Sequence, residues 1–270
     1  MNRIETDLDA AAYHADLTTI SKHGLDLINR APALYAWKKS GEAEEETSPA
    51  LRWGTLVHLA VLEPHKLRDE VAVAPEGIDR RTKAGKEAWA EFEASAAGKI
   101  TCTVEEVRKL REIFDAVRSH PAANALLTGD LGIEHSVYWT DPETGIACRA
   151  RPDVIRCDGL VIDLKTCQSA ERNAFSRASA NYRYNVQAAF YLDGLRANGV
   201  EADAFVFIAV EKEAPFLVQC LAADDSFVSS GRAAYRRDLE TYQRCLTSGD
   251  WPGYSDAVEP LALPAWADRD

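Results

Sequence analysis

The sequence predicts an α+β fold, with a mixed central sheet of about five strands flanked by helices, in one domain spanning residues 1–270. Two observations predict this class. The apolar pattern changes near residue 131, from helical spacing to the alternation typical of strands. Beyond that point, helical segments separate the strand-like ones. We therefore expect a helical front over 1–130, a sheet-containing core over 131–250 and an irregular tail over 251–270.

The helical front contains recognisable start and stop residues. Ser21 suits an N-cap, and Pro32 ends the helix that follows it. The helix ending at Pro64 is apolar nearly all round, which is typical of a buried helix. A charged, loop-like segment separates it from the next helix. The expected helices cover 21–31, 51–64, about 86–97 and about 103–118.

The core is expected to begin with three consecutive strands in a meander. The first two form a hairpin around the Asp141-Pro142 turn, and a tight turn at Asp158-Gly159 leads into the third. An amphipathic helix then ends at Gly199. The expected strands are 133–141, 146–158, 160–166, 202–211 and 215–222, and the expected helices are 185–199 and 225–247.

Composition excludes several classes of protein. No apolar run approaches the ~20 residues that span a membrane, and the N-terminus lacks the pattern of a signal peptide, so we expect a cytoplasmic protein without a membrane partner. Six cysteines without a C-x-x-C pair indicate neither a zinc site nor a disulfide framework. The acidic run 40–49 is expected to be an exposed loop.

Charge is distributed unevenly along the chain. The net charge of −12 argues against nonspecific coating of DNA. Two stretches are nevertheless locally positive: residues 80–86 (RRTKAGK) and residues 149–183, where seven basic residues face four acidic ones. Positive patches in an acidic chain predict a bounded site for an anion.

The strand 160–166 carries the residues that best indicate chemistry. Because side chains alternate across a strand, Asp163 and Lys165 point to one face. Asp153 lies on the neighbouring strand, where it could approach Asp163. Two adjacent buried carboxylates repel, and a hard divalent cation such as Mg²⁺ removes that cost. Lys165 would then orient a water or neutralise charge on phosphorus. A lone Asp-x-Lys pair could equally be an ordinary ion pair.

Two helices offer further ligands. His58 lies in the apolar helix, four residues after Gly54, which could let that helix approach another backbone closely. A histidine beside carboxylates suits a metal, although it could also be a satisfied core residue. Gln187 and Tyr191 stand at i and i+4 on one helical face. They could reach a phosphate or hold the lysine, or simply form a helix surface.

Taken in order, these motifs resemble those of a known superfamily. G-T-x-x-H at 54–58 is followed by EHSVYW at 134–139, RPD at 151–153, DLKT at 163–166 and YNVQAAFY at 184–191. This set resembles the PD-(D/E)XK nucleases, and within them the RecE (exodeoxyribonuclease VIII)-type exonucleases. The segments 17–39, 81–92 and 251–254 also fit. The resemblance implies a restriction-endonuclease-like core.

The resemblance also implies roles for individual residues. The metal ligands would be His58, Asp153, Asp163 and the backbone carbonyl of Leu164. Lys165 would be the catalytic lysine. The accompanying catalytic set would be Asp163, Asp153, Gln187, Tyr191 and Glu134, the last at the acidic position of the first strand. The superfamily more often has glutamate where Asp163 stands, but the RecE-type branch accepts aspartate. Cysteines matching the iron–sulfur relatives are missing from the sequence.

The expected function is a Mg²⁺-dependent exonuclease, with Mn²⁺ equally suited, that degrades linear double-stranded DNA. The resemblance further implies 5′-to-3′ polarity, a role in phage- or prophage-type recombination, a single-strand annealing protein as partner and a homo-oligomeric ring, trimeric or tetrameric. A catalytically silent DNA-end-binding subunit and a nuclease with other DNA substrates are the alternatives. The expected DNA-binding residues are Arg80, Arg81, Lys83, Lys86, Arg149, Arg151 and Arg172.

Overall fold

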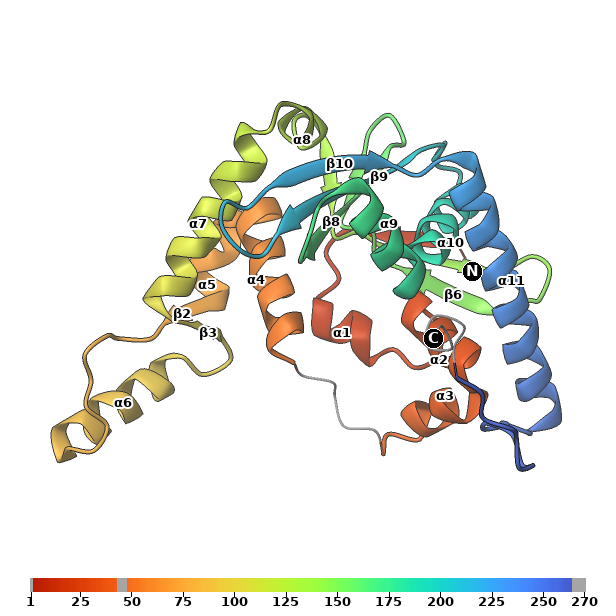
Figure 1. Cartoon of the computed structure of the whole chain (residues 1–270), viewed down its shortest axis with the longest axis horizontal. Helices are drawn as coiled ribbons and strands as arrows, with labels where there is room; N and C mark the ends of the chain where they lie inside the picture. The colour runs from red at the N-terminus through yellow and green to blue at the C-terminus, as the bar shows by residue number, and fades with distance from the viewer. Residues whose placement is uncertain (1, 43–47, 264–270) are drawn as a thin grey trace.

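The computed structural model describes residues 2–42 and 48–263 (Figure 1). Its helical front is interrupted by short strands. The front contains β1 (Arg3–Glu5), α1 (Ala10–Ala15), α2 (Lys22–Arg30), α3 (Pro32–Lys39), α4 (Pro49–Leu62), a 3-10 turn (Pro64–Lys66), α5 (Leu67–Glu70), β2 (Val71–Val73), α6 (Lys83–Ser95), β3 (Ile100–Cys102), α7 (Val104–Ser119) and α8 (Pro121–Leu126). The middle of the expected acidic loop lies outside the described residues.

The second half contains the central sheet and further helices that pack on it. Its elements are β4 (Leu131–Ile133), β5 (Ser136–Thr140), β6 (Ala147–Ala150), β7 (Val154–Arg156), β8 (Val161–Cys167), α9 (Arg172–Asn181), α10 (Tyr184–Ala197), β9 (Phe205–Glu211), β10 (Val218–Ala222) and α11 (Asp225–Ser248). Residues 251–263 contain no helix or strand. No helix within the described ranges is long and apolar enough to cross a membrane.

The central sheet is mixed and five-stranded, in the order β10-β9-β8-β7-β4. Its β8 and β9 run parallel and its other neighbours run antiparallel. The α+β fold class and the five-stranded mixed sheet are thereby confirmed. A second, antiparallel sheet has the order β1-β5-β6, and β2 and β3 form a small parallel pair. The sequence did not predict β1, because three residues are too few for a periodic pattern.

The expected single meander is wrong. Residues 136–140 and 147–150 do form the predicted hairpin, but segment 146–158 is interrupted at Arg151-Pro152-Asp153. The part before this interruption pairs in the small sheet, and the part after it pairs with β8. Pro152 has no N–H to donate to a ladder, which explains why one strand ends there and another begins.

Helix boundaries agree closely with the sequence prediction. The Ser21 hydroxyl accepts a hydrogen bond from the Gly24 N–H (3.3 Å), and α2 ends before Pro32, which starts α3. The sequence prediction did not include α3, because this helix follows α2 without a loop between them. Thr103 and Glu106 form a reciprocal capping box at the start of α7.

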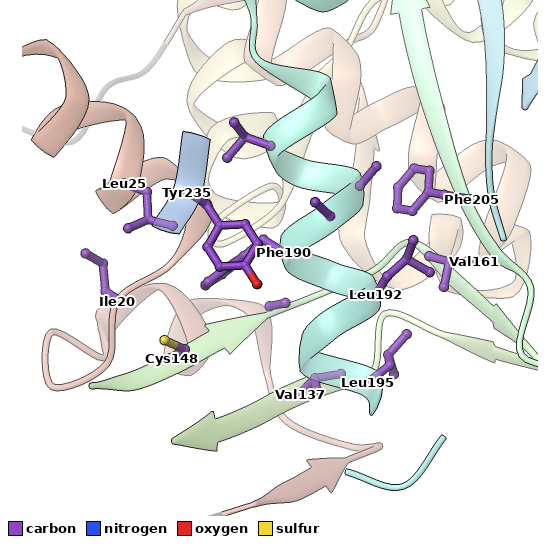
Figure 2. Close-up of a cluster of buried hydrophobic side chains, with 14 of the residues drawn as sticks. Ile20, Leu25, Val137, Cys148, Val161, Phe190, Leu192, Leu195, Phe205 and Tyr235 are labelled. Atoms are coloured by element: carbon purple, nitrogen blue, oxygen red, sulfur yellow. The ribbon is translucent and has the colours of Figure 1, made fainter. Parts of the chain in front are cut away.

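Two clusters of buried side chains cover the two faces of the central sheet. One joins the sheet to α2, α10 and α11, and Figure 2 shows α10 running through its middle with Phe190 and Leu192 among the buried side chains. The other joins the opposite face to α4, α7 and α8. Val161 belongs to the first cluster and Ile162 to the second. Asp163 and Lys165 alternate with Ile162 and therefore face α10.

The close contact of α10 with α11 depends on Gly231. A Cβ added there would lie 1.9 Å from the Asn185 carbonyl oxygen, which is backbone and cannot turn away. We therefore expect Gly231→Ala to lower the free energy of unfolding by about 2–3 kcal/mol. Thermal unfolding followed by circular dichroism measures this.

Gly54 provides the matched control. A Cβ added at this helical position meets nothing within 4 Å, so the suggested close backbone approach at Gly54 is wrong. Gly54→Ala should be neutral or stabilising by up to about 1 kcal/mol, because alanine has the higher helix propensity. Equal melting temperatures for Gly231→Ala and wild type would contradict the packing argument.

Candidate metal centre

The register of β7 against β8 brings two aspartates together. Val154 pairs with Ile162 in this antiparallel ladder, so the next pair toward the centre is Asp153 and Asp163. Both are buried, with exposed fractions of 8% and 0%. The Asp153 Oδ2 accepts a hydrogen bond from the Leu164 N–H at 2.7 Å. Asp163 contacts α10 through Gln187, whereas the Asp153 carboxylate lies beside the Leu164 backbone and faces His58 of α4.

Asp163 is held by two partners. Lys165 Nζ lies 2.6 Å from its Oδ2, and the Gln187 Nε2 donates to its Oδ1 at 2.5 Å. This close contact pairs the buried Oδ2 with the positive charge of the lysine. Lys165 Nζ also lies 4.9 Å from the centroid of the Tyr184 ring. The Asp-x-Lys pair is therefore a buried unit, not a solvated surface ion pair.

His58 reaches this unit from α4, which packs against β8. Its Nε2 lies 2.8 Å from the Leu164 carbonyl oxygen. Its Nδ1 lies 3.6 Å from Asp153 Oδ2 and 3.9 Å from Glu134 Oε1. His58 thus contacts the backbone carbonyl that the resemblance placed among the ligands, in a hydrogen-bonding arrangement.

Glu134 lies in an unusual backbone position between β4 and β5. Its φ of 55° is left-handed, which is uncommon for a residue with a side chain. The Glu134 N–H donates to the Asp153 carbonyl oxygen at 3.0 Å, which ties this turn to the centre. Its Oε2 accepts from Arg151 Nε at 3.0 Å. The turn divides the expected strand 133–141 into two short strands.

Three of these residues form the group best arranged to bind an ion. One ligand atom from each of His58, Glu134 and Asp153 lies within 4.8 Å of the others. Glu134, whose role was the least defined from sequence, is part of this group. Asp163, an expected ligand, lies beside Asp153 but is already contacted by Lys165 and Gln187.

The electrostatics of the centre are dominated by crowded, buried charge. Burial, together with the Asp153 carboxylate, raises the pKa of Asp163 to about 6. Burial also raises the pKa of Asp153. Burial alone would lower the pKa of His58, but the carboxylates of Asp153 and Glu134 outweigh it and raise that pKa to about 9. Likewise, Asp163 and Asp153 outweigh burial and raise the pKa of Lys165.

These residues fit a divalent cation. Carboxylate oxygens, a carbonyl oxygen and an imidazole are suitable ligands for Mg²⁺ or Mn²⁺. One ligand atom from each of His58, Glu134 and Asp153 lies within 4.8 Å of the others, which suits binding of a single ion. Three carboxylates close together in a low-dielectric interior also favour an added positive charge.

The face of α10 predicted from Gln187 and Tyr191 does turn toward the centre. Gln187 is buried and bonds to Asp163. Tyr191 packs near Phe205, with ring centroids 6.4 Å apart. Burial raises the pKa of Tyr191 well above its usual value, and the nearby carboxylates add to this. The two residues therefore border the acidic group from the helix side.

The expected DNA-binding residues fall into three different settings. Arg80, Arg81, Lys83 and Lys86 are exposed, in and just before α6, on the arm that extends to the lower left of Figure 1. Arg172 is exposed in the first turn of α9. Arg149 and Arg151 lie inside the fold.

Arg149 does not fit a DNA-binding role. Its side chain is only 7% exposed and ion-paired with Asp16 at 3.7 Å. It also donates to the Thr19 carbonyl oxygen and hydroxyl, at 2.6 and 2.9 Å. The guanidinium therefore holds the segment before α2. The sequence suggested DNA contact because it gave no indication of these long-range partners.

The fold and the buried centre together define a PD-(D/E)XK-type protein, as the resemblance implied. The chain belongs to the family described as "PDDEXK-like domain of unknown function (DUF3799)", whose model matches residues 21–264. No curated protein matches it.

Two solved structures extend this comparison. A candidate exonuclease from Eubacterium rectale superposes with a TM-score of 0.62 at 14% identity, covering 97% of each chain; this likeness supports the fold. A phage-related exonuclease from Haemophilus somnus matches at 11% identity over 72% of this chain and 95% of its own, with a TM-score of 0.33, too low to support an argument.

Proposed function

We propose that this protein is a divalent-metal-dependent DNA exonuclease that degrades linear double-stranded DNA. The observation that carries the proposal is the buried Asp163–Lys165 pair, which lies beside the group His58, Asp153 and Glu134. The chain that carries it belongs to the PDDEXK-like family. DNA as substrate is supported by the structural neighbour with the TM-score of 0.62, which is named as a candidate exonuclease. The exposed basic residues at 80–86 are suited to contacting phosphates.

Each residue of the centre has a definable task in hydrolysis. His58, Asp153 and Glu134 would hold the cation, with Asp163 and the Leu164 carbonyl as further acceptors. A bound Mg²⁺ or Mn²⁺ would supply Lewis-acid activation of water and of the phosphodiester. Lys165 can donate hydrogen bonds from Nζ to the attacking water or to a phosphate oxygen. Asp163 orients that Nζ, and Gln187 fixes Asp163 from the other side.

The finer features follow from the family resemblance and form part of the proposal. They are 5′-to-3′ polarity, a ring of three or four copies, a single-strand annealing protein as partner and a task in phage- or prophage-type recombination. Mg²⁺ and Mn²⁺ both suit the oxygen-rich ligand set.

Digestion of end-labelled linear duplex DNA tests the proposal. With 5 to 10 mM Mg²⁺, chosen as roughly the range that saturates weak oxygen-ligand sites, we expect progressive shortening and loss of the 5′ label first. Covalently closed circular DNA should survive, which separates an exonuclease from an endonuclease. Parallel substrates with overhangs, nicks or single strands report other preferences. Binding of DNA ends without any shortening, in Mg²⁺ and in Mn²⁺, would favour the silent end-binding subunit.

A further inference from the structure

We propose that Arg151 is a positioning residue that fixes Glu134 for the metal, and that the N-terminal segment 3–16 completes the centre by holding Arg151. This rests on the proposed metal centre. It assigns to Arg151 a task other than the DNA contact expected from sequence. The segment lies before residue 21, where the match to the family model begins.

The first argument is the set of contacts that Arg151 makes. Its Nε donates to Glu134 Oε2 at 3.0 Å, and its Nη2 donates to the Leu8 carbonyl oxygen at 3.0 Å. The side chain is 13% exposed. One planar guanidinium thus connects an acidic residue of the centre to the backbone just before α1, which a point-charge ammonium could not do equally well.

The second argument is how the N-terminal segment is attached. Arg3–Glu5 pairs with β5, and Asp9 caps α1 through its side chain. Tyr13 is 6% exposed. Its ring centroid lies 5.4 Å from Arg151 Cζ and 5.0 Å from Arg149 Cζ. The segment therefore packs against one side of the Arg151 guanidinium.

The third argument is that Glu134 needs such support. Its side chain is 25% exposed, so packing encloses it only in part, and the hydrogen bond from Arg151 restricts the carboxylate further. A glutamate side chain without such a partner would lose conformational entropy when it binds the ion, and this loss would weaken binding. A hydrogen-bonding partner behind a ligand typically changes metal affinity 10- to 100-fold, by orienting it beforehand.

Isothermal titration with Mn²⁺ alone, without DNA, tests the proposal. We expect Arg151→Gln and Arg151→Lys each to weaken Mn²⁺ binding about 10-fold or more. The sign is informative, because removing a positive charge near the centre would by itself strengthen binding of a cation. Arg156→Gln is the matched control: Arg156 also pairs with a carboxylate, Asp158, and a backbone carbonyl, that of Ala125. It should leave Mn²⁺ affinity unchanged.

A double-mutant cycle separates positioning from other effects. If Arg151 acts through Glu134, then Arg151→Gln should cause no further loss of Mn²⁺ affinity in a Glu134→Gln background. Tyr13→Leu, which removes the ring behind the guanidinium, should weaken Mn²⁺ binding in the same direction. Circular dichroism confirms that each variant is folded at the titration temperature.

Three outcomes would overturn the inference: unchanged or tighter Mn²⁺ binding by folded Arg151→Gln, additive losses in the cycle, or no Mn²⁺ binding by wild type. Weaker DNA binding by Arg151→Gln with unchanged Mn²⁺ affinity would restore the DNA-contact interpretation. Failure of the proposed function looks different, because Mn²⁺ would then bind with the expected dependence on Arg151 while linear DNA remained intact.

Discussion

Replacing Lys165 by alanine is expected to lower the rate of DNA hydrolysis by at least about 10²- to 10³-fold. Lys165 Nζ lies 2.6 Å from Asp163 in a buried centre, where a positive charge stabilises developing negative charge far more than it would in water. The loss should appear in kcat, because the lysine is placed to act on the reacting groups rather than on the DNA as a whole. Initial rates on end-labelled duplex DNA at saturating Mg²⁺ measure it.

The control for this substitution is Lys109→Ala. Lys109 also pairs with a carboxylate, Glu213 at 3.1 Å, but at the surface, so the rate should stay near that of wild type. Mn²⁺ affinity provides a second check: removing Lys165 takes a positive charge from the centre and should not weaken the binding of a cation. Near-normal hydrolysis by Lys165→Ala would mean that the Asp-x-Lys pair has no catalytic part.

The central sheet could be predicted because its information is local. Alternation along 160–166 was enough to place Asp163 and Lys165 on one face, and the i, i+4 spacing was enough to place Gln187 and Tyr191 toward them. The assignment of strands to two different sheets could not be predicted. It depends on the interruption at Pro152 and on β1, whose pairing partner lies more than 130 residues away.

The organisation of the centre was only partly predictable for a related reason. The residue types could be read from the chain, but the turn at Glu134 could not. Its left-handed backbone is stabilised by a hydrogen bond to the Asp153 carbonyl. A glycine would have indicated such a turn, whereas a glutamate does not. The grouping of Glu134 with His58 and Asp153 could therefore be recognised only from the fold.

Counting charges along the chain was misleading. The positive excess over 149–183 suggested an anion site, yet most of its basic residues are paired inside the fold. Arg149 pairs with Asp16, Arg151 with Glu134, and Arg183 with both Asp26 and Asp238. A positive run in sequence becomes a positive surface only where its acidic partners lie elsewhere. By that criterion the exposed residues at 80–86 are the better expectation for DNA contact.

Metal binding should also be visible in stability, independently of catalysis. A ligand that binds only the folded state stabilises it by about 2.7 kcal/mol at a hundredfold excess over its Kd. For a chain of this size that corresponds to a rise in Tm of about 5 °C. We expect wild type to show this rise with Mn²⁺ in the absence of DNA, and Asp153→Asn to lose it. Differential scanning calorimetry of metal-free and Mn²⁺-loaded protein measures both.

Asparagine is the informative substitution because it removes the charge while keeping the volume and an oxygen that can accept from the Leu164 N–H. Asp193→Asn is the matched control. Asp193 also accepts hydrogen bonds from several donors, including Arg232 at 2.6 Å and Tyr235 at 2.5 Å, but it joins α10 to α11 and lies outside the proposed metal centre. It should lower Tm, because Arg232 loses a charged partner, and yet retain the full Mn²⁺-induced rise. A rise of equal size in Asp153→Asn would place the ion elsewhere, whereas its loss in that variant alone links the bound metal to the β7–β8 carboxylates.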